Sequence, residues 1–169
     1  MSFAATLLIT LAGASAPAAA QSLEPPASPS SSTVIGLENP LLTRGAEALS
    51  AGQAAEGVRL TLEGLKFPAP PRDVAAAHAN LCAGYALLHH YDEALSECNS
   101  AITLDATNWR AFNNRAAVFS AEGMYDRAIQ DVLVGLKLAP GAAILHRSLS
   151  IIYQNRKLHP SHGRSGTTA

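Results

Sequence analysis

A repeat with a period of thirty-four residues is the feature that most limits what this 169-residue chain can fold into. Residues 91–94 (YDEA) return as residues 125–128 (YDRA), thirty-four positions later. A more divergent copy lies upstream at an offset of seventy-one, which is two periods plus three residues that we place in the proline-rich stretch 68–73. Half a copy follows at 143–155. Repeats of this length indicate stacked structural units, because one unit alone cannot bury its apolar side.

Small residues recur in each unit at the positions where two helices would cross. Proline is absent from 72 to 139, and apolar residues there recur at spacings of three and four, which is typical of helices. Antiparallel helices approach closely only where the residues at their crossing are small. The pattern therefore predicts three closely packed helix pairs. The three trios are Gly45, Gly57 and Gly64; Cys82, Ala94 and Ala101; and Ala116, Ala128 and Gly135.

The unit at 109–142 carries the clearest motif. It contains AFNNRAAVF at 111–119, YDRAI at 125–129 and a closing Pro140. These residues resemble the tetratricopeptide repeat, whose signature has an aromatic and small-residue block, then A-x3-F, then a final proline. The resemblance implies an all-α fold, an α-solenoid of about three helix pairs at 38–71, 75–108 and 109–142 with a capping helix at 143–156. Arg44 and Arg115 depart from the family pattern, because they stand where leucine is usual.

The first twenty residues contain no Asp, Glu, Lys or Arg and are typical of an export signal. An apolar run at 3–11 precedes small residues that end in three alanines, the pattern of a cleaved signal peptide at 1–20, although no Lys or Arg precedes the run. The run is too short to span a bilayer, which takes about 20 apolar residues. We therefore expect a small exported protein of bacterial type, periplasmic or secreted, with no stable membrane insertion after cleavage.

Two further segments are predicted to lie outside the folded domain. Residues 21–37 are rich in proline and serine and are expected to form a disordered linker, and residues 157–169 are expected to form a disordered tail. This division leaves residues 38–156 as the domain.

Charge balance and missing motifs argue against several classes of function. Twelve basic and thirteen acidic residues give a net charge of −1, which argues against a nucleic-acid partner. The sequence contains no Walker loop, Rossmann glycine fingerprint, G-x-S-x-G or zinc-protease motif. We therefore expect no catalytic residues, no cofactor and no metal, and a protein that is not an enzyme.

Cys82 and Cys98 lie on the two predicted helices of one unit, opposite each other across a turn near residues 89–90. In an oxidising compartment such a pair can form a disulfide, worth roughly 3 kcal/mol of stability for a loop of this length. However, helix axes lie about 8–10 Å apart, whereas a disulfide needs Cα atoms within about 7 Å. Two buried free cysteines are therefore the simpler alternative. A thiol-redox or metal-binding protein that uses Cys82 and Cys98, with His78 one helical turn from Cys82, is the alternative function.

The first helix of each pair lines the concave side of an array of this kind. By resemblance to the family, the partner-facing residues are mostly small and apolar, with polar groups toward the C-terminal end. They are Leu42, Ala46, Ala76, Ala79, Ala83, Leu87, Arg110, Asn113, Ala117, Ser120 and Arg147. Such a lining suits an apolar helix or an extended peptide. It does not suit the acidic C-terminal peptides that chaperone-associated family members bind, because alanine at 79 and 83 replaces their charged or amide residues.

The sequence thus predicts a non-enzymatic scaffold or adaptor of the cell envelope whose concave groove binds a peptide or helix of another protein. On this hypothesis, Ala79→Glu combined with Ala83→Glu abolishes binding without unfolding the chain. The convex side is the alternative binding surface, and the sequence does not separate the two.

Overall fold

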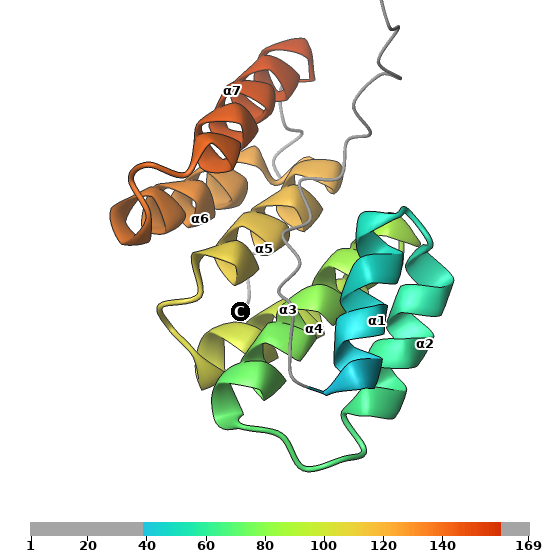
Figure 1. Ribbon diagram of the computed structural model, residues 1–169. Coiled ribbons are helices and arrows are strands. Elements are labelled where there is room, and N and C mark those ends of the chain that lie inside the picture. The colour runs from blue at the N-terminus through green and yellow to red at the C-terminus, as the bar shows by residue number, and fades with distance from the viewer. Residues whose placement is uncertain (1–38, 160–169) are drawn as a thin grey trace, which may run out of the picture.

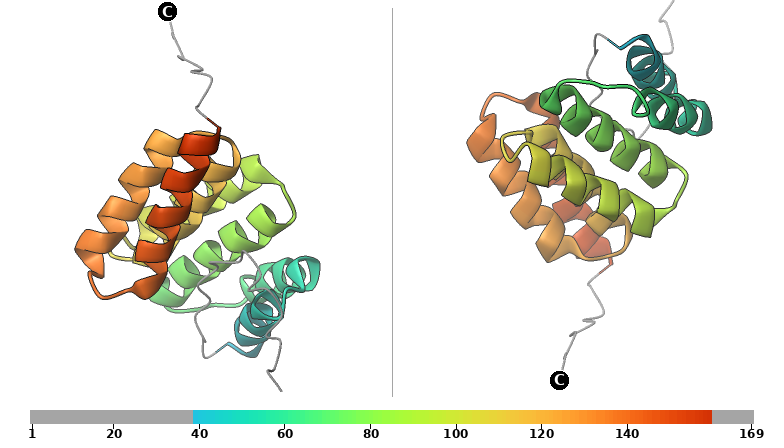
Figure 2. Two further views of the ribbon diagram at one scale, coloured as in Figure 1. Left: turned by 90° about the horizontal axis from the view of Figure 1, so that it is seen from above. Right: turned by 90° about the horizontal axis from the view of Figure 1, so that it is seen from below.

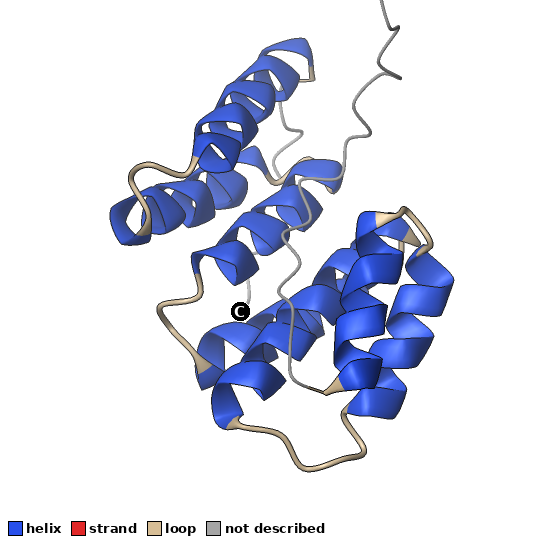
Figure 3. Ribbon diagram, viewed as in Figure 1, coloured by secondary structure: helices blue, strands red, loops and turns tan. Residues whose placement is uncertain are grey.

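The computed structural model describes residues 39–159, which form seven α-helices (Figure 1, Figure 3). They are α1 (Pro40–Ser50), α2 (Ala54–Gly64), α3 (Pro71–Leu87), α4 (Tyr91–Leu104), α5 (Trp109–Ala121), α6 (Tyr125–Leu138) and α7 (Ala143–Leu158). The described residues contain no strand, and the predicted all-α class is confirmed. The predicted signal peptide and linker, at 1–20 and 21–37, lie outside the described residues.

The helices stack as successive antiparallel pairs. α1 packs against α2, α3 against α4 and α5 against α6, and α7 packs against both α5 and α6. The first helices also contact one another in order, α1 with α3, α3 with α5 and α5 with α7. Figure 2 shows this stack from two further sides. The predicted α-solenoid of three helix pairs and one further helix is therefore confirmed. No helix between residues 39 and 159 is long and apolar enough to cross a bilayer.

Two helix boundaries differ from those predicted. The second pair begins at Pro71 rather than at residue 75, because the first turn of a helix tolerates a residue without a backbone N–H. α7 ends at Leu158 rather than at residue 156, so the first two residues of the predicted tail are helical. An exposed ion pair of 3.2 Å joins Arg156, near the end of α7, to Asp126 at the start of α6.

All nine small residues at the predicted helix crossings are buried. Gly57 on α2 shows why size matters there. A Cβ atom at this position would lie 2.5 Å from Leu49 Cγ and 3.0 Å from the backbone oxygen of Gly45. Because the backbone oxygen cannot move aside as a side chain can, the close approach of α1 and α2 depends on glycine.

The start of α1 is fixed by Asn39. Its Oδ1 accepts hydrogen bonds from the backbone N–H groups of Leu41 and Leu42, at 3.0 Å and 3.4 Å. Its Nδ2 donates to the backbone oxygen of Gly64 at 3.2 Å. An N-cap side chain satisfies donors that the first helical turn leaves free. Here the same residue also joins the beginning of α1 to the end of α2.

The turn inside each pair uses the left-handed backbone conformation at one equivalent position. Gly52 (φ 77°) and Gly123 (φ 76°) adopt it in the first and third pairs, and His89 (φ 61°) adopts it in the second. This conformation costs a residue with a side chain about 1–2 kcal/mol.

We expect His89→Gly to raise the free energy of unfolding by up to about 1 kcal/mol, because the entropy cost of glycine offsets part of the strain relieved. Urea denaturation of the two proteins measures the difference. A less stable variant would contradict the prediction and would show that the hydrogen bond of 2.8 Å between His89 and Tyr91 outweighs the backbone strain.

Candidate protein-interaction face

The predicted groove residues all lie on α1, α3, α5 and α7, the first helices of the pairs and the final helix. About half of these residues are buried inside the array. Five of them are at most 2% exposed: Leu42, Ala46, Ala76, Ala79 and Ala83. The structure corrects this part of the prediction, because these side chains have no surface to offer a partner. Asn113 is also buried and accepts a hydrogen bond of 2.8 Å from Ser148 on α7.

The cause is the small size of the side chains on α3. The side chain of Asn114 on α5 donates to the backbone oxygen of Ala79 at 3.0 Å, so α5 lies directly on α3 at that point. On the opposite flank, a Cβ atom at Gly84 would lie 2.5 Å from Val58 Cγ2 on α2. Alanine and glycine therefore let the neighbouring helices close over α3. Glutamate at Ala79 and Ala83 would place unpaired carboxylates in this packed layer, so that double variant cannot separate loss of binding from loss of folding.

The accessible part of the predicted groove lies over α5 and α7. Ala117 and Arg147 are exposed, and Arg110 and Ser120 are half-buried. Leu87, at the end of α3, is also half-buried. Ile151 follows Arg147 by one helical turn and is 43% exposed. We call the surface formed by Arg110, Ala117, Ser120, Arg147 and Ile151 the α5–α7 face.

This face is cationic. α5 and α7 contain no Asp or Glu, whereas they carry four arginines and a lysine. Two of the arginines are engaged, Arg115 with Asp131 and Arg156 with Asp126. Arg110 and Arg147 form no ion pair with any residue in the range 39–159. The α5–α7 face therefore presents positive charge that the described part of the chain does not balance.

Arg110 is held in an unusual environment for a free cation. Its guanidinium carbon lies 4.4 Å from the ring centroid of Trp109, a cation–π arrangement. Its Nε is buried and has no hydrogen-bond partner among the described residues. Burial lowers the pKa of Arg110 from its ordinary value. A carboxylate from a partner would supply the counter-charge that this guanidinium lacks among the described residues.

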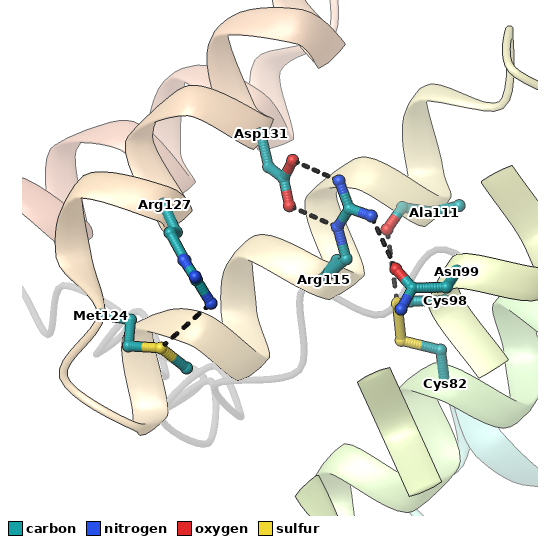
Figure 4. Close-up of polar contacts among 8 residues, drawn as sticks. All are labelled: Cys82, Cys98, Asn99, Ala111, Arg115, Met124, Arg127 and Asp131. Atoms are coloured by element: carbon teal, nitrogen blue, oxygen red, sulfur yellow. Dashed lines mark hydrogen bonds and ion pairs between the residues drawn. A yellow bond between two sulfur atoms is a disulfide. The ribbon is translucent and has the colours of Figure 1, made fainter. Parts of the chain in front are cut away.

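A polar cluster around Arg115 was not predicted from the sequence (Figure 4). Its Nε and Nη2 donate to the two oxygens of Asp131, each at 2.8 Å, and its Nη1 donates to Asn99 Oδ1 at 2.7 Å. These bonds join α5 to α6 within one pair and to α4 of the preceding pair. The hydrogen bond with Asp131 raises the pKa of Arg115, despite partial burial. The sequence does show an arginine where the repeat usually has leucine. The spacing of residues alone does not indicate which carboxylate of α6 pairs with it.

Cys82 and Cys98 form a disulfide between α3 and α4, with Cα atoms 5.1 Å apart (Figure 4). The general spacing of helix axes argued against this bond, but small residues at this crossing bring the two backbones closer. Both cysteines are completely buried beside Ala94 and Val118. His78, the third member of the alternative metal set, instead binds Glu97 at 2.5 Å. The two sulfurs are bonded to each other and shielded from solvent, so the structure gives no support to the thiol-redox or metal-binding alternative.

Comparison with solved structures identifies the class to which this arrangement belongs. The second TPR domain of the human RPAP3 protein, solved with the HSP70 peptide SGPTIEEVD, is 26% identical, covers 67% of this chain and 92% of its own, and has a TM-score of 0.56. The first TPR domain of the same protein is 23% identical, with 73% and 94% covered and a TM-score of 0.63. The TPR2B domain of yeast Sti1, solved with pHsp70, is 22% identical, with 70% and 94% covered and a TM-score of 0.59.

These likenesses confirm the resemblance drawn from the sequence: the described residues adopt the fold of a tetratricopeptide-repeat domain. No family model matches the chain.

Proposed function

We propose that this protein is an interaction module of the cell envelope that holds a segment of another protein on the α5–α7 face. The observation that carries the proposal is that the neighbouring helices α5 and α7 carry two unbalanced cations, Arg110 and Arg147, together with the exposed residues Ala117 and Ile151. The peptide-bound TPR domains of RPAP3 and Sti1 support a protein segment as the ligand. The proposal includes no catalytic activity of the domain itself.

The chemistry of the face favours a segment that carries both carboxylates and apolar side chains. Arginine binds carboxylates through paired hydrogen bonds, and its planar group tolerates partial burial better than an ammonium does. Ala117 and Ile151, which follow these arginines along α5 and α7, provide the apolar contact. This differs from the mostly apolar lining expected from the sequence, because the buried alanines of α3 do not contribute to the surface.

The location in the cell envelope is proposed from the sequence and from the disulfide. Disulfides persist in oxidising compartments and are rare in the cytosol. A buried disulfide in a chain with an apolar, uncharged leader supports export of a mature protein that begins near Gln21. Edman sequencing or mass spectrometry of the protein isolated from cell fractions tests this. An intact N-terminus on a protein recovered only from the cytosol would overturn the export proposal and leave the interaction proposal standing.

We expect Arg147→Glu to weaken binding of the partner at least about tenfold. The variant loses roughly one charge-assisted contact, and its new carboxylate repels the carboxylates of the partner. Lys137→Glu is the matched control, because it makes the same charge change at an exposed position of α6. The partner is first identified by cross-linking, and its affinity for each variant is then measured by titration. The affinity of the wild type is measured at two salt concentrations. Equal affinities for Arg147→Glu and the wild type would exclude the α5–α7 face as the binding surface.

A further inference from the structure

A cavity of about 520 Å³ lies at the N-terminal edge of the array, between the start of α1 and the connection from α2 to α3. Its lining is apolar except for one amide and one carboxylate. The lining residues are Asn39, Pro40, Leu41, Phe67, Pro68, Ala69, Pro70 and Asp73. Phe67 is 55% exposed, which leaves a large apolar side chain in contact with water.

Both walls of the cavity are held in place by the fold. The hydrogen bond from Asn39 to Gly64 fixes the start of α1 against the end of α2. The opposite wall is formed by Pro68, Pro70 and the first turn of α3, where the proline rings restrict the backbone. The cavity is therefore preformed, and its size is in the range of about 300–1,000 Å³ that ligand pockets occupy.

We propose that residues 34–37 of this chain (VIGL) fill this cavity and act as an N-terminal cap of the repeat array. These residues include three large apolar side chains, Val34, Ile35 and Leu37, and they end two residues before Asn39, which lines the cavity. An extended chain covers about 3.3–3.6 Å per residue, so each of the three side chains is within reach of Phe67 and Pro68. Attachment to the rim raises the local concentration of the segment to about the millimolar range.

The chain offers no better occupant of its own. Residues 21–33 are dominated by Ser and Pro and contain one large apolar residue, Leu23. Residues 160–169 (PSHGRSGTTA) contain none. In addition, no helix pair precedes α1 in the described array, and terminal units of a repeat array need a cover that internal units receive from their neighbours. The end of the predicted linker is thus assigned to the fold rather than to a spacer.

Methyl–aromatic NOEs in the full chain test the proposal. With Ile, Leu and Val methyl groups labelled, we expect NOEs from Ile35 and Leu37 to the ring of Phe67, which disappear in Phe67→Ala. Because Phe67 is largely exposed, that variant leaves the helices intact. We also expect Ile35→Asp with Leu37→Asp to speed amide exchange in the first turn of α1. Leu23→Asp is the matched control and should change neither readout.

Two outcomes would overturn the assignment. The first is the absence of NOEs between residues 34–37 and Phe67 in the wild type. The second is that these NOEs appear only between molecules in a sample of mixed labelling, which would assign the cavity to a second copy of the chain. Neither outcome bears on the α5–α7 face, so this test and the test of partner binding are independent.

Discussion

Replacing Arg115 with leucine is expected to lower the free energy of unfolding by about 3–5 kcal/mol, although leucine is the usual residue of the repeat at this position. The reason is Asp131, which is 6% exposed and receives both of its ion-pair hydrogen bonds from Arg115. Removal of the guanidinium leaves a buried carboxylate without a counter-charge. The loss is measured by urea denaturation followed by far-UV circular dichroism.

Two further variants separate this mechanism from a general effect of removing arginine. Arg115→Leu combined with Asp131→Leu is expected to recover most of the lost stability, because an apolar pair can replace a buried ion pair of similar volume. Arg59→Leu should change stability little, because Arg59 forms its ion pairs with Glu56 and Glu63 on the exposed surface of α2. If Arg115→Leu and Arg59→Leu behave alike, the cluster around Arg115 does not contribute to joining the repeats.

Replacing both Cys82 and Cys98 with alanine is expected to cost about 3 kcal/mol and to lower the Tm by roughly 10 °C, since the bond closes a short loop between adjacent helices. The sequence separation of the two cysteines is 16 residues. At position 82 alanine preserves the close helix crossing, because the equivalent positions of the other pairs hold Gly45 and Ala116. The positions equivalent to Cys98 hold Thr61 and Val132, so alanine at 98 also removes some buried side-chain volume. Thermal unfolding of the variant and of the wild type gives the difference directly.

The burial of the bond makes a second expectation possible. Both cysteines are completely buried, so a thiol reductant should reach the disulfide only when the domain opens. The wild type should stay oxidised in dithiothreitol without denaturant and lose the bond quickly in urea. Rapid reduction of the folded protein would contradict this view and would reopen the thiol-redox alternative.

Much of the fold could be predicted because it depends on residue size at a fixed period. The thirty-four-residue spacing and the nine small crossing residues determine which helices pair, and each of those residues is buried where expected. Helix ends were less predictable. Pro71 begins α3 instead of preceding it, because proline breaks a helix in its interior but not in its first turn.

The candidate site was predicted less well, for a related reason. Family positions on α3 were expected to face a partner, but alanine there is so small that the neighbouring helices close over it. The accessibility of a groove depends on how closely the helices approach each other. That distance cannot be predicted from the residue at any single position. The disulfide was underestimated for the same reason, since a general helix spacing was used where Cys82 and Ala94 permit a shorter one. The partners of Arg115 were missed because they lie on two other helices.

Site-specific photo-cross-linking tests the central claim, that the α5–α7 face holds a partner protein. A benzoylphenylalanine residue is introduced in living cells at Ala117 on this face, or at Gln130 on the outward side of α6, both of which are exposed. We predict that the probe at 117 captures a specific protein and that the probe at 130 does not. Capture at 130 with none at 117 would contradict the claim and would move the binding surface to the second helices.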